Sequence, residues 1–359
     1  MKQTEELMLT LDDVSGTLYE RMLASAIEKQ ADSFRVMRSL VNINTDLVNT
    51  AGVEILIPKR IALDATVVSE GASLTLQTPS YDSVSIKVQI YGAAVEIGEE
   101  TVAASQYNLI NDALENLALA IAEKEDVDLV TALIDRTEAG ILSTTTASST
   151  GADVTFNLSN GNVLTINEVI SDGTTLTAYS LNYKNGAITI TTAMSAEGIL
   201  TVDYAYAASV TCIAPTVAGA IEYADLISAR MQVIINKFRP DTVLVSPYQH
   251  ADLLKDSNLV DTSKYGSNET VMNGEIGKVA GMRVIVSNNM PDGVVAVFDS
   301  KRACTYAIKR NLWTKMTKEG SYAVKGTIAI MAKMWAKAGL VNPEAICLIT
   351  GAQDLATLS

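Results

Sequence analysis

The chain of 359 residues is long enough to bury a sizeable core and to form more than one domain. Its apolar fraction of 48% and charged fraction of 19% indicate an ordered, globular protein. The net charge of −14 without a basic cluster argues against a nucleic-acid-binding surface, and the sequence offers neither a membrane-spanning apolar run nor a signal peptide.

The first 50 residues are predicted to form an arm with a helix over 18–38. Residues 51–63 predict a short strand that ends at Pro58. The apolar side chains expected to anchor the helix are Leu23, Ile27, Phe34 and Val36.

Residues 85–91 alternate between apolar and polar side chains, which is typical of a half-buried strand. Residues 65–68 are predicted as its partner, and the intervening 69–81 are long, polar and turn-rich. A two-stranded ribbon is marginally stable alone in water. We therefore expect this ribbon to lie on another surface, most simply that of a neighbouring subunit.

A helix of about 31 residues, roughly 46 Å long, is predicted to follow Ser105 as its N-cap and to continue until shortly before Gly140. Its opposite side is expected to be solvated and acidic, with Glu115, Glu123, Glu125, Asp126 and Asp128. The apolar stripe consists of Leu109, Ile110, Ala113, Leu114, Leu117, Ile121, Val127, Val130, Leu133 and Ile134.

The composition changes at Gly140, where a linker is predicted over 143–151 and a small β-sandwich over 153–211. Only six of residues 141–212 are charged, which favours a separate apolar core. The hairpin signals are Asn160-Gly161, Asp172-Gly173 and Asn185-Gly186. Further along, a helix is predicted over 218–238 and strands over 326–341 and 345–349.

Residues with catalytic potential are scarce. His250, the one histidine, lies at a predicted helix start and is interpreted as a surface or cap residue. The stretch with Gly274, Gly277 and Gly281 lacks the spacing of a dinucleotide loop and predicts a hairpin turn. Asp126 and Asp128 do not face each other on a helix, and no Cys-x-x-Cys occurs. We expect no catalytic, cofactor or metal site, and reduced thiols at Cys212, Cys304 and Cys347.

The order of these features resembles the tailed-phage major capsid proteins, whose fold is named after phage Hong Kong ninety-seven. The resemblance rests on 69–72, 81–86, 95–101 and the long helix, and then on 239–247, 252–256 and 274–287. It implies an α+β fold with a spine helix, an extended β-hairpin loop, axial and peripheral domains, and here an inserted all-β domain.

The resemblance also implies the layout of the chain. It places an arm at 1–50, an extended loop at 51–90, a peripheral domain with the spine helix at 91–140, the insert at 141–213, an axial domain at 214–324, and a return to the peripheral domain at 325–359. Contacts with neighbouring subunits are expected from the loop residues Ser69, Glu70, Gly71, Leu74 and Tyr81.

The implied function is structural, not enzymatic: an icosahedral shell of pentamers and hexamers around a viral double-stranded DNA genome, assembled in the host cytoplasm and retained in the virion. Scaffold, portal and decoration proteins are possible partners, DNA is expected to make only non-specific contacts, and no membrane is involved. An encapsulin-type cellular shell is the nearest alternative, and a carbohydrate-binding adhesin based on 153–211 is an alternative of another class.

The founding member of the fold joins its subunits through a lysine on the extended loop. Residues 61–86 of this chain contain no lysine, and the nearest lysines, Lys59 and Lys87, are placed at the base of the ribbon. A shell held by non-covalent contacts alone is therefore predicted.

Overall fold

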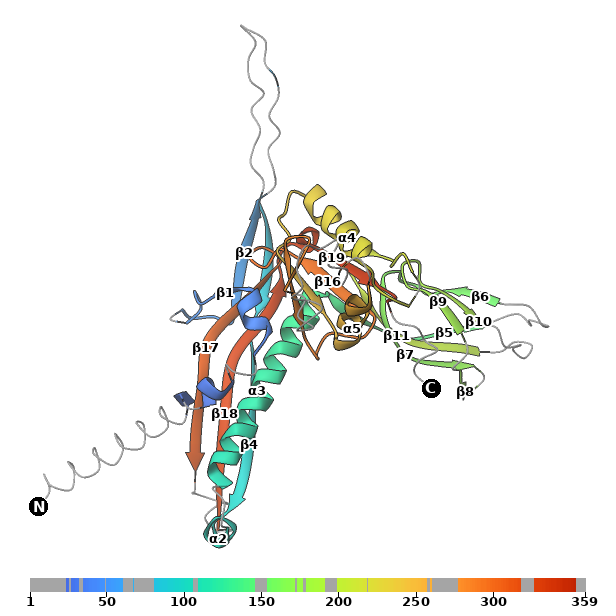
Figure 1. Cartoon of the computed structure of the whole chain (residues 1–359). Coiled ribbons are helices and arrows are strands. Elements are labelled where there is room, and N and C mark those ends of the chain that lie inside the picture. Colours follow the sequence, from blue (N-terminus) through green and yellow to red (C-terminus); the bar gives the residue numbers. More distant parts are fainter. Residues whose placement is uncertain are drawn as a thin grey trace, which may run out of the picture. The chain divides into compact units, whose positions relative to one another are not determined.

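The computed structural model describes the chain in two compact units (Figure 1). The first contains the described residues up to 35 together with those in 43–125 and 305–341, and the second contains those in 36–42, 126–304 and 342–359. The described residues are 24–25, 27–31, 35–48, 50–60, 67, 81–105, 109–145, 154–171, 173–176, 179–190, 199–217, 219–256, 259, 277–317 and 326–352.

The first unit is built on a four-stranded sheet in the order β1-β17-β18-β4. Its strands are β1 (Asn42–Asn44), β17 (Cys304–Thr317), β18 (Thr327–Leu340) and β4 (Gln89–Gly98). β18 pairs antiparallel with β4 over ten residues, from Thr327 opposite Gly98 to Ala336 opposite Gln89. A short helix, α2 (Glu99–Ala104), follows β4, and the long helix α3 (Leu109–Leu133) comes next.

Helix α3 confirms the predicted spine helix but differs from the prediction at both ends. Ser105 is the C-cap of α2, and its N–H donates to the Thr101 carbonyl at 3.0 Å. The described helix has 25 residues, and the chain is already extended from Arg136 onward. Val127 is exposed, and Leu129 takes its place in the buried stripe.

The two-stranded ribbon consists of β2 (Glu54–Arg60) and β3 (Tyr81–Lys87), which pair antiparallel in register from Glu54 opposite Lys87 to Arg60 opposite Tyr81. The predicted strand over 85–91 is therefore split between β3 and β4. Its partner is β2, and the predicted partner at 65–68 lies outside the described residues apart from Val67. β2 also continues through Pro58, because a strand with one paired edge can lack an N–H on the other.

The arm differs from its prediction in the same region. Residues 27–31 are helical, with Ile27 fully buried, whereas Arg35 is non-helical and Met37–Leu40 form a 3₁₀ turn, η1. The predicted helix over 18–38 is thus wrong at its C-terminal end, and Leu23 and Phe34 lie outside the described residues.

The second unit contains a six-stranded mixed sheet in the order β12-β19-β16-β13-β15-β14. Helix α4 (Tyr223–Ile235) buries Leu226, Ala229 and Val233 in its core, and α5 (Pro247–Lys255) adds Leu253. The strands are β12 (Thr211–Ile213), β13 (Thr242–Val245), β14 (Lys278–Val279), β15 (Met282–Val286), β16 (Val294–Phe298) and β19 (Ile346–Thr350), the last preceded by the 3₁₀ turn η2 (Pro343–Ala345).

Two further sheets of this unit share a core, as the sandwich prediction requires. One has the order β5-β11-β7-β8 and the other β6-β10-β9. Val202 and Tyr204 from the first sheet meet Ile188 and Ile190 from the second. The strands are β5 (Arg136–Thr145), β6 (Val154–Asn157), β7 (Val163–Ser171), β8 (Thr174–Thr175), β9 (Tyr179–Asn182), β10 (Ala187–Ile190) and β11 (Ile199–Ala207).

Several details of this unit depart from the sequence predictions. Residues 143–145 extend strand β5 and are not a linker. Asn160-Gly161 lies between β6 and β7, which belong to different sheets, so it is not a hairpin turn. Residues 211–213 and 346–350 form strands of the six-stranded sheet, although the first were assigned to the insert and the second to the peripheral part.

Other predicted turns are confirmed. Gly173 (φ +78°) turns β7 into β8, and Gly186 (φ +67°) turns β9 into β10. Ala280 (φ +49°) and Gly281 (φ +83°) connect β14 to β15, which confirms a hairpin turn at this glycine-rich stretch. Positive φ at two successive positions is the geometry that favours glycine in a tight hairpin.

Candidate assembly surfaces

The β2–β3 ribbon has one packed face and one open face. On the packed face, Ile55 and Ile57 stand opposite Ile86 and Val84, and all four contact a small core that includes Leu47, Val88 and Ala307. On the open face, Leu56 is 64% exposed and Ser85 donates to the Glu54 carboxylate. The base of the ribbon is thus packed against its own unit, whereas Leu56 on the opposite face is exposed in the described part of the chain.

The ribbon base is held close to strand β18. A Cβ atom at Gly339 would lie 2.5 Å from Cδ1 and 2.6 Å from Cγ1 of Ile86, far inside van der Waals contact. Nearby in the same unit, the Lys309 ammonium donates to the Gly52 carbonyl. Only glycine fits at position 339 without moving Ile86, so this contact fixes where the ribbon leaves the sheet.

Four of the five predicted contact residues, Ser69, Glu70, Gly71 and Leu74, lie outside the described residues. The fifth, Tyr81, is the first residue of β3. The sequence prediction of the contact surface therefore remains a prediction.

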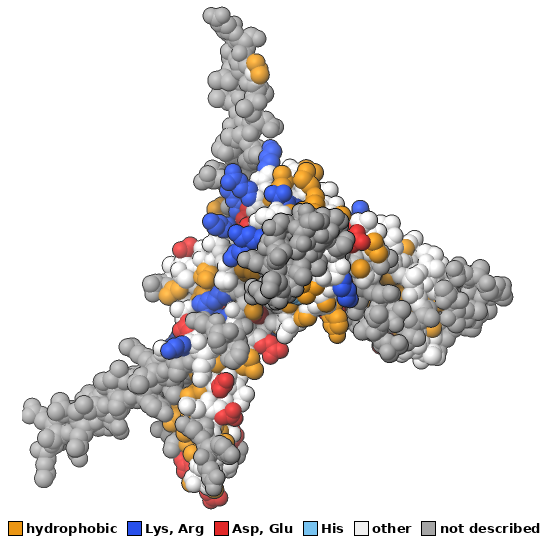
Figure 2. Space-filling model, viewed as in Figure 1, with side chains coloured by type: hydrophobic (Ala, Val, Ile, Leu, Met, Phe, Trp, Pro, Cys, Tyr) orange, Lys and Arg blue, Asp and Glu red, His pale blue; other side chains and the backbone are white. Residues whose placement is uncertain are grey.

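The hairpin formed by β17 and β18 carries a concentration of positive charge. Strands β17 and β18 contain no Asp or Glu and five cationic residues, in a chain with a net charge of −14: Lys309, Arg310, Lys315, Lys333 and Lys337. Along β18, half-buried Lys333 and Trp335 alternate with the buried Ala332, Met334 and Ala336. The exposed side of this sheet is therefore basic and aromatic, and Figure 2 shows Lys and Arg side chains gathered around the base of the ribbon.

The cations of this face are paired with its two tryptophans. Lys309 Nζ lies 5.4 Å from the ring centroid of Trp335, Arg310 Cζ lies 4.4 Å from that of Trp313, and Lys333 Nζ lies 5.7 Å from the Trp313 ring. These cation–π contacts hold the long side chains over flat apolar surfaces. The sequence did not reveal this cluster, because its members come from two strands and alternate with apolar residues.

Helix α4 exposes a row of apolar side chains on the side away from its core. Ile227, Met231, Ile234 and Ile235 recur at helical spacing and are all exposed, Ile235 to 65%. Hydrophobic side chains are visible over α4 in Figure 2. A row of this kind on a surface helix is typical of an interface that the isolated chain leaves open.

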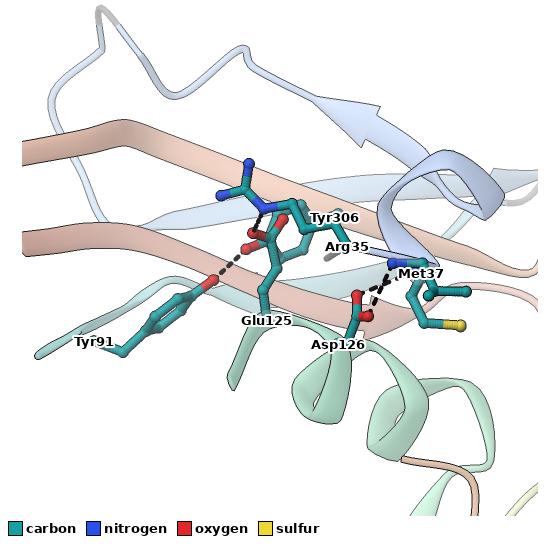
Figure 3. A network of polar contacts seen from close by, with 7 residues as sticks. Arg35, Met37, Tyr91, Glu125, Asp126 and Tyr306 are labelled. Carbon is teal, nitrogen blue, oxygen red and sulfur yellow. Dashed lines mark hydrogen bonds and ion pairs between the residues drawn. The ribbon is translucent and has the colours of Figure 1, made fainter. Parts of the chain in front are cut away.

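Two neighbouring acids of α3, expected on its solvated side, are instead buried (Figure 3). In the first unit, Glu125 forms a 2.7 Å ion pair with the buried guanidinium of Arg35. In the second unit, both oxygens of Asp126 accept main-chain hydrogen bonds, from Val36 N–H at 2.9 Å and from Met37 N–H at 3.1 Å. Residues 35–37 are thus bound by the carboxylates of Glu125 and Asp126. The helical periodicity of the sequence alone places both carboxylates on the solvent side.

Polar chemistry elsewhere is sparse among the described residues. His250 lies near the start of α5, as predicted, but it is half-buried and the N-cap is Ser246. No group of three or more His, Cys, Asp or Glu with metal-binding geometry occurs in the described part of the chain. None of the helices described there has the length and apolarity needed to cross a bilayer.

The three cysteines are buried and free. Burial raises the pKa of Cys212 and of Cys347 to about 12, and it raises the pKa of Cys304 still further above its ordinary value. The thiols are therefore protonated and unreactive near neutral pH.

Comparison with known proteins gives two family matches. The model described as "Phage capsid family" matches residues 16–197, about half of the chain, and the model described as "Phage capsid protein" matches residues 182–349. No curated protein sequence matches the chain.

Solved structures with a similar fold include the capsid of cyanophage P-SCSP1u, with 14% identity, 89% of each chain covered and a TM-score of 0.59. The mature capsid of bacteriophage PhiM1 shares 13% identity over 88% of this chain and 86% of its own, with a TM-score of 0.54. A virus-like particle from Pyrococcus furiosus shares 10% identity over 92% of this chain and 99% of its own, with a TM-score of 0.53. At these identities the structures establish the fold alone.

Proposed function

Because this chain belongs to the phage capsid family and is a major capsid protein of an icosahedral shell, we propose that it assembles through pentamers and hexamers around a double-stranded DNA genome. The observation that supports a ring-forming subunit most directly is the presence of two open surfaces of different character. Among the described residues, the α4 row is exposed and the Lys and Trp side chains of the basic, aromatic β17–β18 face are half-buried or exposed. A ring-forming subunit needs more than one contact surface, and a head-to-tail contact closes into a ring when the rotation between neighbours closes.

The β17–β18 face is proposed as the seat for the extended loop of a neighbouring subunit. Residues 61–80 contain Asp64 and Glu70 and no Lys or Arg, so their charge is opposite to that of the seat. The contact residues predicted from the sequence, Ser69, Glu70, Gly71 and Leu74, belong to this segment. Exposed charge pairs contribute only about 0.2–1 kcal/mol each, so the loop depends on several of them together with the apolar area of the tryptophans.

The apolar row of α4 is proposed to meet its counterparts at the centre of each pentamer or hexamer. Its four residues offer a contact that tolerates small rotations, because apolar packing has no fixed donor–acceptor geometry. One chain can then form rings of two sizes. The α4 prediction over 218–238 located this helix, although only the residues Tyr223–Ile235 are helical.

Charge reversal tests the loop seat. The double variant Lys315→Glu/Lys333→Glu should keep its circular dichroism spectrum but lose most of its shells in negative-stain images. The variant Lys255→Glu, at a 77% exposed side chain on α5, is the matched control and should assemble normally. Adding Glu70→Lys to the double variant should restore part of the shell yield, because the loop then carries the complementary charge.

The loop itself is tested by deleting residues 69–80. The deletion should leave the folded core intact, since the ribbon base is fastened by its own packed face. It should abolish shells in electron micrographs. Intact shells from this deletion, or normal shells from the charge-reversed double variant, would contradict the proposed seat.

Within the predicted insert over 141–213, residues 141–207 are proposed to form an inserted domain that stabilises the surface of the shell or binds a decoration protein. The support is the core shared by its two sheets, which contains Val163, Val202 and Tyr204. Replacing only residues 146–206 with a short Gly/Ser bridge would leave β5 without its partner strand β11. The variant should therefore remove the whole sandwich, residues 136–207, and join Asp135 to Ala208 through the bridge. The Ala208 N–H already donates to the Asp135 carbonyl at 3.3 Å, which shows that these ends lie together.

The encapsulin alternative has less support, and the content of the particles decides it. A phage shell filled in an infected host contains DNA, whereas an encapsulin contains a cargo enzyme. Nuclease-resistant DNA in particles purified from infected cells supports the virion location. Scaffold and portal proteins are further proposed partners and would be identified in the same particles by mass spectrometry.

A further inference from the structure

The second unit contains an open cavity of about 650 Å³ that none of the assembly surfaces uses. Strands β5, β7 and β9 line it on one side, and the segment that follows β15 lines it on the other. Its volume lies within the range of small-molecule sites, roughly 300–1,000 Å³.

The polar groups of the cavity are balanced in charge and mixed in hydrogen-bonding character. One guanidinium, from Arg136, and one carboxylate, from Asp292, offset each other. Asn288 and Asn289 add amides, each of which offers donors and an acceptor. Such a lining favours a neutral ligand with many hydroxyl groups over an anion such as a phosphate, which would need clustered positive charge.

An unsatisfied hydroxyl lies in the same wall. The Thr165 Oγ1 atom is buried and has no hydrogen-bond partner within the described structure. A buried polar group without a partner is destabilising, so native proteins rarely retain one without reason. A ligand hydroxyl placed in the cavity would supply the missing partner.

The segment of residues 288–292, which lines one side of the cavity, is held by hydrogen bonds of its own main chain. The Asn289 N–H donates to Ser287 Oγ at 3.3 Å, and the Met290 N–H donates to the Ser287 carbonyl at 3.3 Å. At the end of the loop, the Val294 N–H donates to the Pro291 carbonyl at 3.3 Å. A wall held in this way needs little reorganisation when a ligand binds, which lowers the entropic cost of binding.

An aromatic ring completes the site. Tyr179, at the start of β9, lines the cavity and is half-buried. Burial raises the pKa of its phenol, so the hydroxyl stays protonated and can donate a hydrogen bond. The ring itself offers a flat apolar surface of the kind on which the C–H face of a sugar can lie.

We propose that this cavity binds a short neutral oligosaccharide, with Asn288, Asn289 and Thr165 bonded to its hydroxyls and Tyr179 against one sugar ring. This goes beyond shell formation and gives the particle an affinity for glycans. Arg136 already engages Glu138 through Nε at 2.8 Å, which leaves its terminal nitrogens as further donors.

The test is saturation-transfer NMR on the full-length protein with maltotriose, chitotriose and methyl α-mannoside as probes, and inorganic phosphate in a competition arm. At least one sugar should receive saturation and should not be displaced by phosphate. The exposed Asn288→Ala and the lining Tyr179→Ala should each weaken that signal at least tenfold, whereas Asn116→Ala, at an exposed site on α3, should leave it unchanged.

Circular dichroism should show that the variants fold. Should Tyr179→Ala fail to fold, Asn288→Ala and the near-isosteric Asn288→Asp still test the site. Transfer to none of the three sugars, displacement by phosphate, or equal transfer to the wild type and to a folded Asn288 variant overturns the proposal.

Discussion

Replacing Asp126 with alanine should release the chain at residues 36–37 from helix α3. Asp126 is 3% exposed, and its two oxygens accept hydrogen bonds from the backbone N–H groups of Val36 and Met37. Alanine leaves both donors without these acceptors. Each buried donor left unsatisfied costs about 1–3 kcal/mol, so the expected loss is about 2–6 kcal/mol. Asp126→Asn retains one acceptor oxygen and should lose roughly half as much.

Hydrogen exchange measured by mass spectrometry reports this loss directly at the affected amides. A peptide that covers residues 35–40 should lose protection by about 30-fold or more in Asp126→Ala, since ~1.4 kcal/mol corresponds to a factor of ten. The control is Glu123→Ala, three residues earlier at an exposed position of the same helix, which should leave the peptide unchanged. Equal protection in the wild type and in Asp126→Ala would show that the two hydrogen bonds do not hold this segment.

Three further outcomes are expected. Gly339→Ala should lower the free energy of unfolding by about 1–3 kcal/mol, because the added Cβ overlaps Ile86, and Ile86→Val should restore part of the lost stability. Gly277→Ala, where no atom lies within 4 Å of the added Cβ, should be neutral. Equal effects at the two glycines in a urea titration would refute the overlap. Native protein at pH 8 should resist alkylation by iodoacetamide at all three cysteines, because burial raises each thiol pKa and the reactive thiolate is scarce below it; rapid labelling before unfolding would contradict this. Particles boiled in SDS should run as a single monomer band, and a ladder of covalent oligomers would direct attention to Lys59 and Lys87.

The sequence was most informative where local chemistry decides the structure. The apolar spacing of α3 predicted a long helix, because Leu114, Leu117 and Ile121 follow the helical period and are all buried. The turns at Gly186 and Gly281 were predictable because positive φ favours glycine. The order of these elements also led to the correct family.

Long-range pairing was where the sequence failed. Glu125 and Asp126 have the pattern of a solvated helix side, and only the distant residues 35–37 explain their burial. The basic face was invisible for the same reason, since Trp313 and Trp335 meet their cations across two strands. Strand β19 could not be placed either, because its apolar run fits any buried sheet.

The strand order of the six-stranded sheet has a consequence for how the protein is made. Strand β19 lies between β12 and β16, yet it is synthesised 48 residues after Phe298, the last residue of β16. At about 5–20 residues per second, the ribosome needs roughly 2–10 s to supply it. During that interval the fully apolar strand β16 and its other neighbour β12 have no strand between them, and unpaired edges of this kind are prone to join those of other chains. On a polysome many copies of the chain are made side by side. The number of chains that reach the shell should therefore depend on the speed of translation and on any chaperone that shields the unpaired edges until β19 is made.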